Sequence, residues 1–123
     1  MKILLLLLPM LLLGEETAVE EQTESFISHY EYGEMLYNNP RGVSCSKCHG
    51  RSGEGKIIVQ YKDTYAKEPI KGADIRQKSL VKMVDSVARY HKVMPRYYLT
   101  DNEVRAIYDF LQKKNEVYLN SIN

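Results

Sequence analysis

The sequence lacks a hydrophobic run long enough to cross a membrane. Its N-terminal apolar run, from Ile3 to Leu13, has eleven residues, whereas a membrane-spanning helix needs about 20. One lysine precedes this run, two glutamates follow it, and Pro9 would interrupt a helix there. We therefore predict a secretory signal peptide over residues 1–14 and an exported protein. An uncleaved N-terminal membrane anchor is the alternative interpretation.

Cysteine is scarce, because Cys45 and Cys48 are the only two in the chain. A disulfide between them would close a very small loop and stabilise the fold little, so we expect this pair to be functional. Without residues 1–14 the chain is long enough for one small domain and too short for two. We predict an acidic N-terminal extension over residues 15–27 and a single domain over residues 28–123.

Neither sign of charge dominates the chain, whose formal net charge is +1, but the charges are unevenly distributed. Residues 15–40 contain seven acidic residues and no lysine or arginine, whereas residues 41–96 contain thirteen basic residues against five acidic ones. The segment that holds the cysteines is therefore strongly positive. This pattern is typical of a solvated lysine-rich surface or of a basic face that steers an acidic partner.

Strand patterns and internal repeats are nearly absent, and three helices account for most of the domain. Ser28 with Glu31 and Thr100 with Glu103 form capping boxes that predict two helix starts, and Ser79 can begin a third. The apolar positions with helical spacing are Phe26, Ile27, Tyr30, Gly33 and Tyr37 in the first helix, Leu80, Met83, Val84, Val87 and Tyr90 in the second, and Val104, Ile107, Tyr108 and Leu111 in the last.

The segment between the first two helices predicts mainly loop. "GRSGEGK" is a glycine-rich turn region and not a phosphate loop, because no strand precedes it and no GK[ST] closes it. Ile57 to Tyr61 could form a strand, but one strand without a partner rarely persists. We therefore expect residues 57–78 to be mostly loop.

The stretch "VSCSKCHG" is compatible with three chemistries: a redox dithiol, a zinc site and a covalently attached haem. A redox dithiol belongs beside a strand-helix-strand pattern, which this helical chain lacks. Zinc would require two of His29, His49 and His91. However, His49 directly follows Cys48, so these adjacent ligands would strain a tetrahedral site, and no paired ligands appear downstream.

The spacing C-x-x-C-H is the attachment signature of c-type haem. In a helical turn Cys45 and Cys48 lie on the same side, so each sulfur can form a thioether with one of the two haem vinyl groups. His49 lies four residues after Cys45 on that face and can place its imidazole on the iron. We therefore predict one covalent haem c bound through Cys45 and Cys48, with His49 as an axial ligand.

The second axial ligand must come from elsewhere in the chain. Met35 and Met83 lie within predicted helices, where a core position is expected, and His29 is expected at the surface. Met94 instead lies in a short loop before Pro95, which keeps the backbone irregular. His91 is the rival, although we expect it at the solvent side of its helix end. We predict Met94 as the second axial ligand.

The stretches "YGEMLYNN", "CSKCHGRSGEG" and "MPRYYLTDNEVRAIYDFL" together resemble the small monohaem cytochromes c of class I, over residues 28–112. The resemblance implies an all-α fold in which the N-terminal and C-terminal helices cross and the covalent haem lies in the core. It also implies a crossing through a small residue and an aromatic contact, for which Gly33, Tyr37 and Tyr108 are the candidates. The family's haem cysteines, proximal histidine and distal methionine fall on Cys45, Cys48, His49 and Met94.

Two features depart from this family. The acidic extension from Glu15 to about Glu24 is absent from compact members and leaves open a role as a tether or linker. The chain also has no tryptophan, so the contacts to the haem propionates are unassigned, with Tyr97 and Tyr98 as candidates.

Histidine and methionine ligation implies a carrier of single electrons and not an enzyme, because both axial positions are filled. From the export signal we expect a periplasmic protein, and we expect it to be a monomer that has no nucleic-acid partner and docks transiently at membrane complexes. By resemblance, its donor would be a quinol-oxidising complex or another periplasmic carrier, and its acceptor a terminal oxidase, reductase or peroxidase. Two alternatives remain: a haem-bearing subunit tethered to a membrane respiratory complex, and, if Met94 does not bind, a five-coordinate haem sensor or enzyme.

Overall fold

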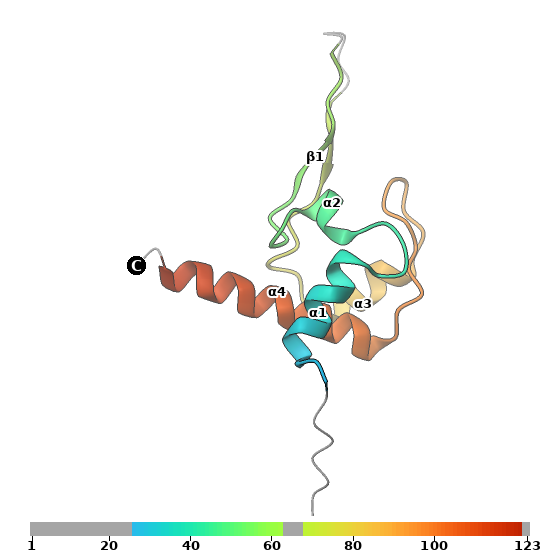
Figure 1. Ribbon diagram of the computed structural model, residues 1–123. Coiled ribbons are helices and arrows are strands. Elements are labelled where there is room, and N and C mark those ends of the chain that lie inside the picture. Colours follow the sequence, from blue (N-terminus) through green and yellow to red (C-terminus); the bar gives the residue numbers. More distant parts are fainter. Residues whose placement is uncertain (1–25, 63–67, 122–123) are drawn as a thin grey trace, which may run out of the picture.

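The computed structural model describes residues 26–62 and 68–121, where the regular structure is four helices and one small sheet (Figure 1). The elements in order are α1 (His29–Asn38), α2 (Cys45–His49), β1 (Lys56–Val59), β2 (Ile70–Gly72), α3 (Leu80–Ala88) and α4 (Asp101–Ser121). The predicted signal peptide and nearly all of the acidic extension lie outside the described residues. Within the described ranges no helix is both long and apolar enough to span a membrane.

The predicted helix starts are confirmed. At α1 the Ser28 hydroxyl accepts a hydrogen bond from the Glu31 amide, and the Ser28 amide donates to the Glu31 carboxylate. Thr100 and Glu103 exchange the same pair of bonds at the start of α4, and Ser79 accepts from the amide of Lys82 at α3. Each side chain thereby satisfies backbone amides that the first helical turn leaves without partners.

The core forms where α1 packs across α4 (Figure 1). Gly33 lies directly against the backbone of Ala106 on α4, so the predicted small-residue crossing is present. The aromatic contact, however, is made by Phe110, whose ring centroid lies 5.6 Å from that of Tyr37. Tyr108 was the wrong choice for this contact: it is partly buried and packs beside the core cluster, whereas Phe110 is fully buried within it. Phe110 follows Ile107 by three positions and therefore shares its face of the helix.

Two predicted helix faces extended too far. α3 ends at Ala88, and Arg89 has extended backbone with φ −96° and ψ 161°. Tyr90 consequently leaves the inward face and is 80% exposed. Phe26 and Ile27 precede the first helical residue and are exposed as well. The backbone leaves helical geometry at both ends, so helical spacing no longer predicts which side chains face the core.

The expectation of loop over residues 57–78 is wrong in two places. β1 and β2 pair antiparallel, with Ile57 opposite Lys71 and an irregularity before Val59 pairs with Ile70. The resulting hairpin projects from the helical body (Figure 1). The partner strand has only three residues, too few for a readable alternation of apolar and polar positions. The fold remains all-α apart from this hairpin.

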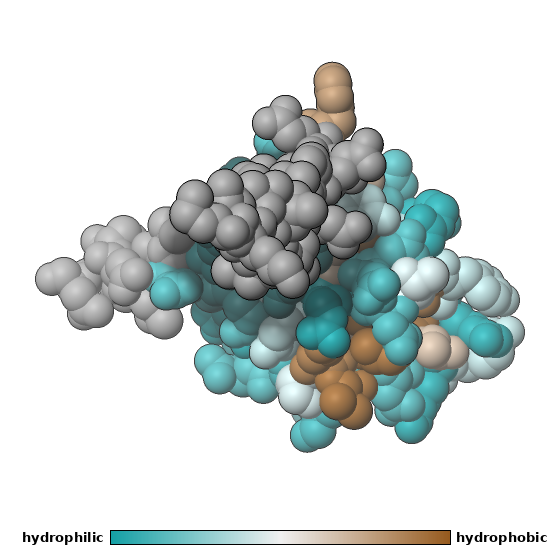
Figure 2. Space-filling model, turned by 90° about the horizontal axis from the view of Figure 1, so that it is seen from below, coloured by the Kyte–Doolittle hydropathy of each residue, from teal (hydrophilic) through white to brown (hydrophobic). Residues whose placement is uncertain are grey.

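On the face seen from below, hydrophilic side chains predominate, and hydrophobic ones gather mainly in one area among them (Figure 2). Several large hydrophobic side chains of the described ranges are exposed, including Val81 and Tyr98.

Replacing Gly33 with alanine should destabilise the protein, because the added Cβ would collide with the Ala106 carbonyl and the Phe110 side chain. We expect the free energy of unfolding to fall by about 1–3 kcal/mol, as for other overpacked cores, measured by denaturant unfolding of the haem-loaded protein. Gly42→Ala is the matched control, since the nearest atom to its Cβ is the Tyr97 ring at 3.4 Å. Equal stability of the two variants would contradict this account of the crossing.

Candidate functional site

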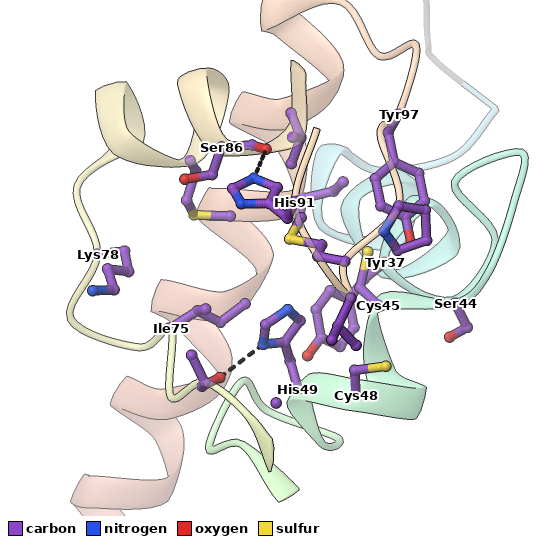
Figure 3. Close-up of a pocket in the computed structure, with 18 of the residues that line it drawn as sticks. Tyr37, Ser44, Cys45, Cys48, His49, Ile75, Lys78, Ser86, His91 and Tyr97 are labelled. Carbon is purple, nitrogen blue, oxygen red and sulfur yellow. Dashed lines mark hydrogen bonds between the residues drawn. The ribbon is translucent and has the colours of Figure 1, made fainter. Parts of the chain in front are cut away.

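A cavity of about 450 Å³ lies between α2, the hairpin, α3, α4 and the segment from α3 to α4 (Figure 3). The four predicted site residues Cys45, Cys48, His49 and Met94 all line it. Two of the rejected candidates, His91 and Met83, line it as well. The other two do not: Met35 is 48% exposed on α1, and His29 pairs with Asp109 at 2.9 Å on the outside of the α1–α4 contact.

Helix α2 is only five residues long and is held in place from both sides. From α1, the buried Tyr37 hydroxyl donates to the carbonyl of Gly50 at 2.8 Å, just beyond the end of α2. Burial raises the pKa of Tyr37 above its usual range, so this hydroxyl stays a neutral donor. From the other side, Gly72 at the end of β2 lies directly on the backbone of Cys48, where a Cβ would not fit.

The ring of His49 has one nitrogen engaged and one available. Its Nδ1 lies 2.7 Å from the carbonyl oxygen of Ala73, which directly follows β2. A carbonyl oxygen only accepts hydrogen bonds, so Nδ1 carries a proton, and in the neutral imidazole Nε2 keeps its lone pair. Metal-binding histidines are oriented in this way. The partner comes from the end of the hairpin that the sequence did not predict, and no local pattern indicated it.

The ring of His91 is engaged through its other nitrogen. Its Nε2 donates to the carbonyl of Ser86 near the end of α3, at 2.7 Å. Figure 3 shows the two histidines on opposite sides of the cavity, each with one nitrogen bound to a backbone carbonyl. For His91 to bind a metal through Nε2, this hydrogen bond must first break.

The segment that carries Met94 is irregular but firmly attached. The Tyr97 amide donates to the carbonyl of Val87 at the end of α3, at 2.8 Å. The Tyr97 hydroxyl donates to the carbonyl of Val43 just before α2, at 2.6 Å. Burial raises the pKa of this hydroxyl to about 12, so it stays protonated. These bonds attach the Met94 segment to α3 on one side and to the start of the cysteine segment on the other.

A second attachment runs through Arg41, which lies between α1 and α2. Its guanidinium donates two bonds of 2.8 Å to the Glu103 carboxylate and one of 3.0 Å to the carbonyl of Tyr98. Arg41 adopts a positive φ of 59°, a conformation rare outside glycine. The hydrogen bonds from Arg41, together with those from the Thr100 cap, lower the pKa of Glu103 to about 2.

The cysteines are unsuited to the two alternative chemistries. Before attachment to a haem, burial raises the pKa of the Cys45 thiol to about 11, whereas reactive redox cysteines have lowered values. In the part of the chain that the structure describes, no three His, Cys, Asp or Glu side chains are arranged to hold a metal ion. A zinc site of the kind considered from the sequence is therefore not formed by these residues.

The comparisons with known proteins point the same way. The cytochrome c family model matches residues 30–114, which is more than two thirds of the chain. This chain belongs to the cytochrome c family. No curated protein and no solved structure matches it.

Family membership settles the cofactor and the general role. A cytochrome c domain carries covalently attached haem c, so this chain is a haem c electron-transfer protein, and one haem is typical of a domain this small. The cavity suits that group, because its volume is within the range of cofactor sites, about 300–1,000 Å³, and its wall is largely apolar. The individual roles of Cys45, Cys48, His49 and Met94 remain predictions that the family match does not test.

Replacing Gly72 with alanine should disturb the cytochrome at α2, the helix that carries the predicted haem cysteines and is called the attachment helix below. The added Cβ would overlap the Cys48 carbonyl, so β2 must move away and lengthen the bond between Ala73 and His49. We expect a loss of at least about 1–3 kcal/mol in the free energy of unfolding, together with a changed reduction potential, because His49, the predicted axial ligand, loses its hydrogen-bond partner. Potentiometry and denaturant unfolding of the haem-loaded variant, with Gly42→Ala as control, measure both effects.

The contribution of Glu103 to stability should depend on pH. Its folded pKa of about 2 lies below the ordinary value of 4.5, so the stabilisation is complete above about pH 4.5 and is lost as the pH falls towards 2. Glu103→Gln should therefore lower the thermal midpoint at pH 7 and approach the native protein at pH 2–3.

Asp85→Asn serves as the control for this pH series, because it removes an exposed ion pair with Arg89 whose side chains are 51% and 66% exposed. Such pairs contribute about 0.3–0.5 kcal/mol. A gap between native protein and Glu103→Gln that stays constant from pH 7 to 2 would show that the carboxylate charge is not responsible.

Proposed function

We propose that this protein is an exported carrier of single electrons whose haem c is attached through Cys45 and Cys48 and ligated by His49 and Met94. The observation that carries the proposal is that these four residues line one cavity, where the Ala73 carbonyl holds Nδ1 of His49 and leaves its Nε2 available. His91 is held in a different way, through Nε2 on the Ser86 carbonyl, which leaves only its Nδ1 for a metal. The haem supplies the one-electron chemistry of its iron, and the chain supplies the ligands and the dry surroundings.

The choice of Met94 rests on its backbone. Met83 also lines the cavity, but it is 8% exposed within helix α3 and belongs to the core cluster with Val104 and Ile107. Its side chain already fills space between α3 and α4. Met94 is half-buried in an irregular and otherwise mostly exposed segment, whose far end is attached through the buried Tyr97. A methionine ligand favours the reduced iron and raises the reduction potential.

The charge around the cavity favours an acidic redox partner. Four lysines and no acidic residue occur among the described residues of the wall, and the exposed Lys47 lies on α2 between the two cysteines. Basic residues around a redox centre steer an acidic protein and make its association fast and dependent on salt. We propose a quinol-oxidising complex or another periplasmic carrier as donor, and a terminal oxidase, reductase or peroxidase as acceptor.

The export part of the proposal rests on residues 1–14. A lysine followed by a short apolar run is typical of a secretory signal. A periplasmic location also suits the redox partners proposed above. A soluble protein that starts near Glu15, found by N-terminal sequencing of the periplasmic fraction, is the expected result. A membrane-bound protein that retains residues 1–14 would favour the tethered subunit.

Met94→Ala should abolish the iron–sulfur absorption band of the oxidised protein and lower its reduction potential, because the methionine ligand is lost. Met83→Leu and Met35→Ala are matched controls that should keep the band, the first on the cavity wall and the second exposed on α1. Visible spectra of the three variants, compared at equal haem content, make the measurement.

Two results would count against this ligation. Loss of the band in Met83→Leu with retention in Met94→Ala would move the ligand to α3. Rapid stoichiometric binding of carbon monoxide by the reduced native protein would mean that the second axial position is open, which favours a sensor or a haem enzyme over a carrier.

A further inference from the structure

The cavity wall has a charge asymmetry that axial ligation does not explain. Lys71, Lys78, Lys82 and Lys92 line it, and no Asp or Glu occurs among the described residues of the wall. The remaining wall is mainly apolar, with tyrosine, serine and histidine side chains. An acidic neighbour of Lys78 is Asp74, which is hydrogen-bonded to Arg76 and does not line the wall. Positive charges on a wall without a carboxylate of its own favour a bound group that brings negative charge.

Three of these lysines lie on the hairpin, at the start of α3 and on the segment between the two. Lys71 lies on β2, Lys78 lies between β2 and α3, and Lys82 lies in the first turn of α3. Figure 3 shows Lys78 on the opposite side of the cavity from Cys48 and Ser44, with His49 between them. Lys78 thus lies across the cavity from α2, whereas Lys71 directly precedes Gly72, which lies on the backbone of Cys48.

The chemistry of haem matches this arrangement. Its two vinyl groups, which form the thioethers, lie on one edge of the macrocycle, and its two propionates lie on the opposite edge. A haem attached through Cys45 and Cys48 therefore directs both carboxylates away from α2. In this cavity that direction leads towards Lys78 and its neighbours.

We propose that Lys78 and Lys82, assisted by Lys71, bind the haem propionates and set the charge around them. The inference rests on the proposed attachment through Cys45 and Cys48, and it supplies the contacts that the absence of tryptophan leaves unassigned. The two tyrosines considered from the sequence do not serve this purpose. Tyr98 lies outside the cavity wall and is 77% exposed, and the Tyr97 hydroxyl already donates a hydrogen bond to the carbonyl of Val43.

The lysines act on the potential through charge. Reduction adds one electron to the haem, and nearby positive charge favours the reduced form by offsetting the ionised propionates. The same positive charge lowers the pKa of each propionate, because an opposite charge favours its ionised form. The other charged or titratable groups of the wall are Lys92, His49, His91, Cys45, Cys48, Tyr37 and Tyr97. Each of the two histidine rings has one nitrogen bound to a backbone carbonyl, and Asp74 beside the wall is bonded to Arg76.

The experiment measures the reduction potential from pH 4 to 9 in the haem-loaded protein and in the double variant Lys78→Gln with Lys82→Gln. We expect the double variant to have a lower reduction potential throughout the neutral range. We also expect the propionates to bind protons about tenfold more tightly, so that the pH range in which the potential changes moves up by about one unit. Lys71→Gln should shift both quantities in the same direction by less. Lys78→Arg with Lys82→Arg should restore the native values.

Lys47→Gln is the matched control, because it removes the same charge from the attachment helix at an exposed position outside the cavity wall. Equal behaviour of this control and the double glutamine variant, in potential and in pH dependence, overturns the inference. The iron–sulfur band separates this result from a failure of the proposed ligation. It should persist in every lysine variant, and its absence from the native protein would count against Met94 while leaving the lysine effect measurable.

Discussion

The backbone contact between Gly33 and Ala106 is the constraint on which the site depends. It lets α1 and α4 approach closely enough for Phe110 to pack against Tyr37. Tyr37 then reaches the carbonyl of Gly50 and holds the end of the attachment helix. A larger residue at the crossing would separate the helices, and the hydroxyl that holds α2 would move with α1.

Several side chains of the largely apolar cavity wall donate to backbone carbonyls of other segments. His49, His91 and Tyr97 each bind such a carbonyl on a different segment. Backbone acceptors are fixed by the fold, so these bonds transmit the positions of α3, the hairpin and the segment before α2 to the cavity wall. Half-buried segments without helical or strand hydrogen bonds need such partners, because unpaired polar groups are costly to bury. The irregular Met94 segment is thereby held without secondary structure of its own.

Charge is arranged in two layers around this site. The apolar interior disfavours isolated charge, whereas lysines occupy the rim and no carboxylate occurs among the described wall residues. Under the two proposals above, the same positive charge acts on the bound haem and on an approaching acidic protein. Glu103, which does not line the cavity, is paired with Arg41.

The sequence by itself determined what local chemistry controls. The capping residues Ser28 and Thr100 set where two helices begin, and the spacing of Cys45, Cys48 and His49 indicated haem attachment, because these signals involve residues within one or two turns. Tertiary structure alone decided the pairing of β1 with β2, the Ala73 carbonyl that fixes the proton of His49, and the lysine wall. These features join segments far apart in the chain, and no local spacing encodes which distant residues will meet once α1 and α4 have packed.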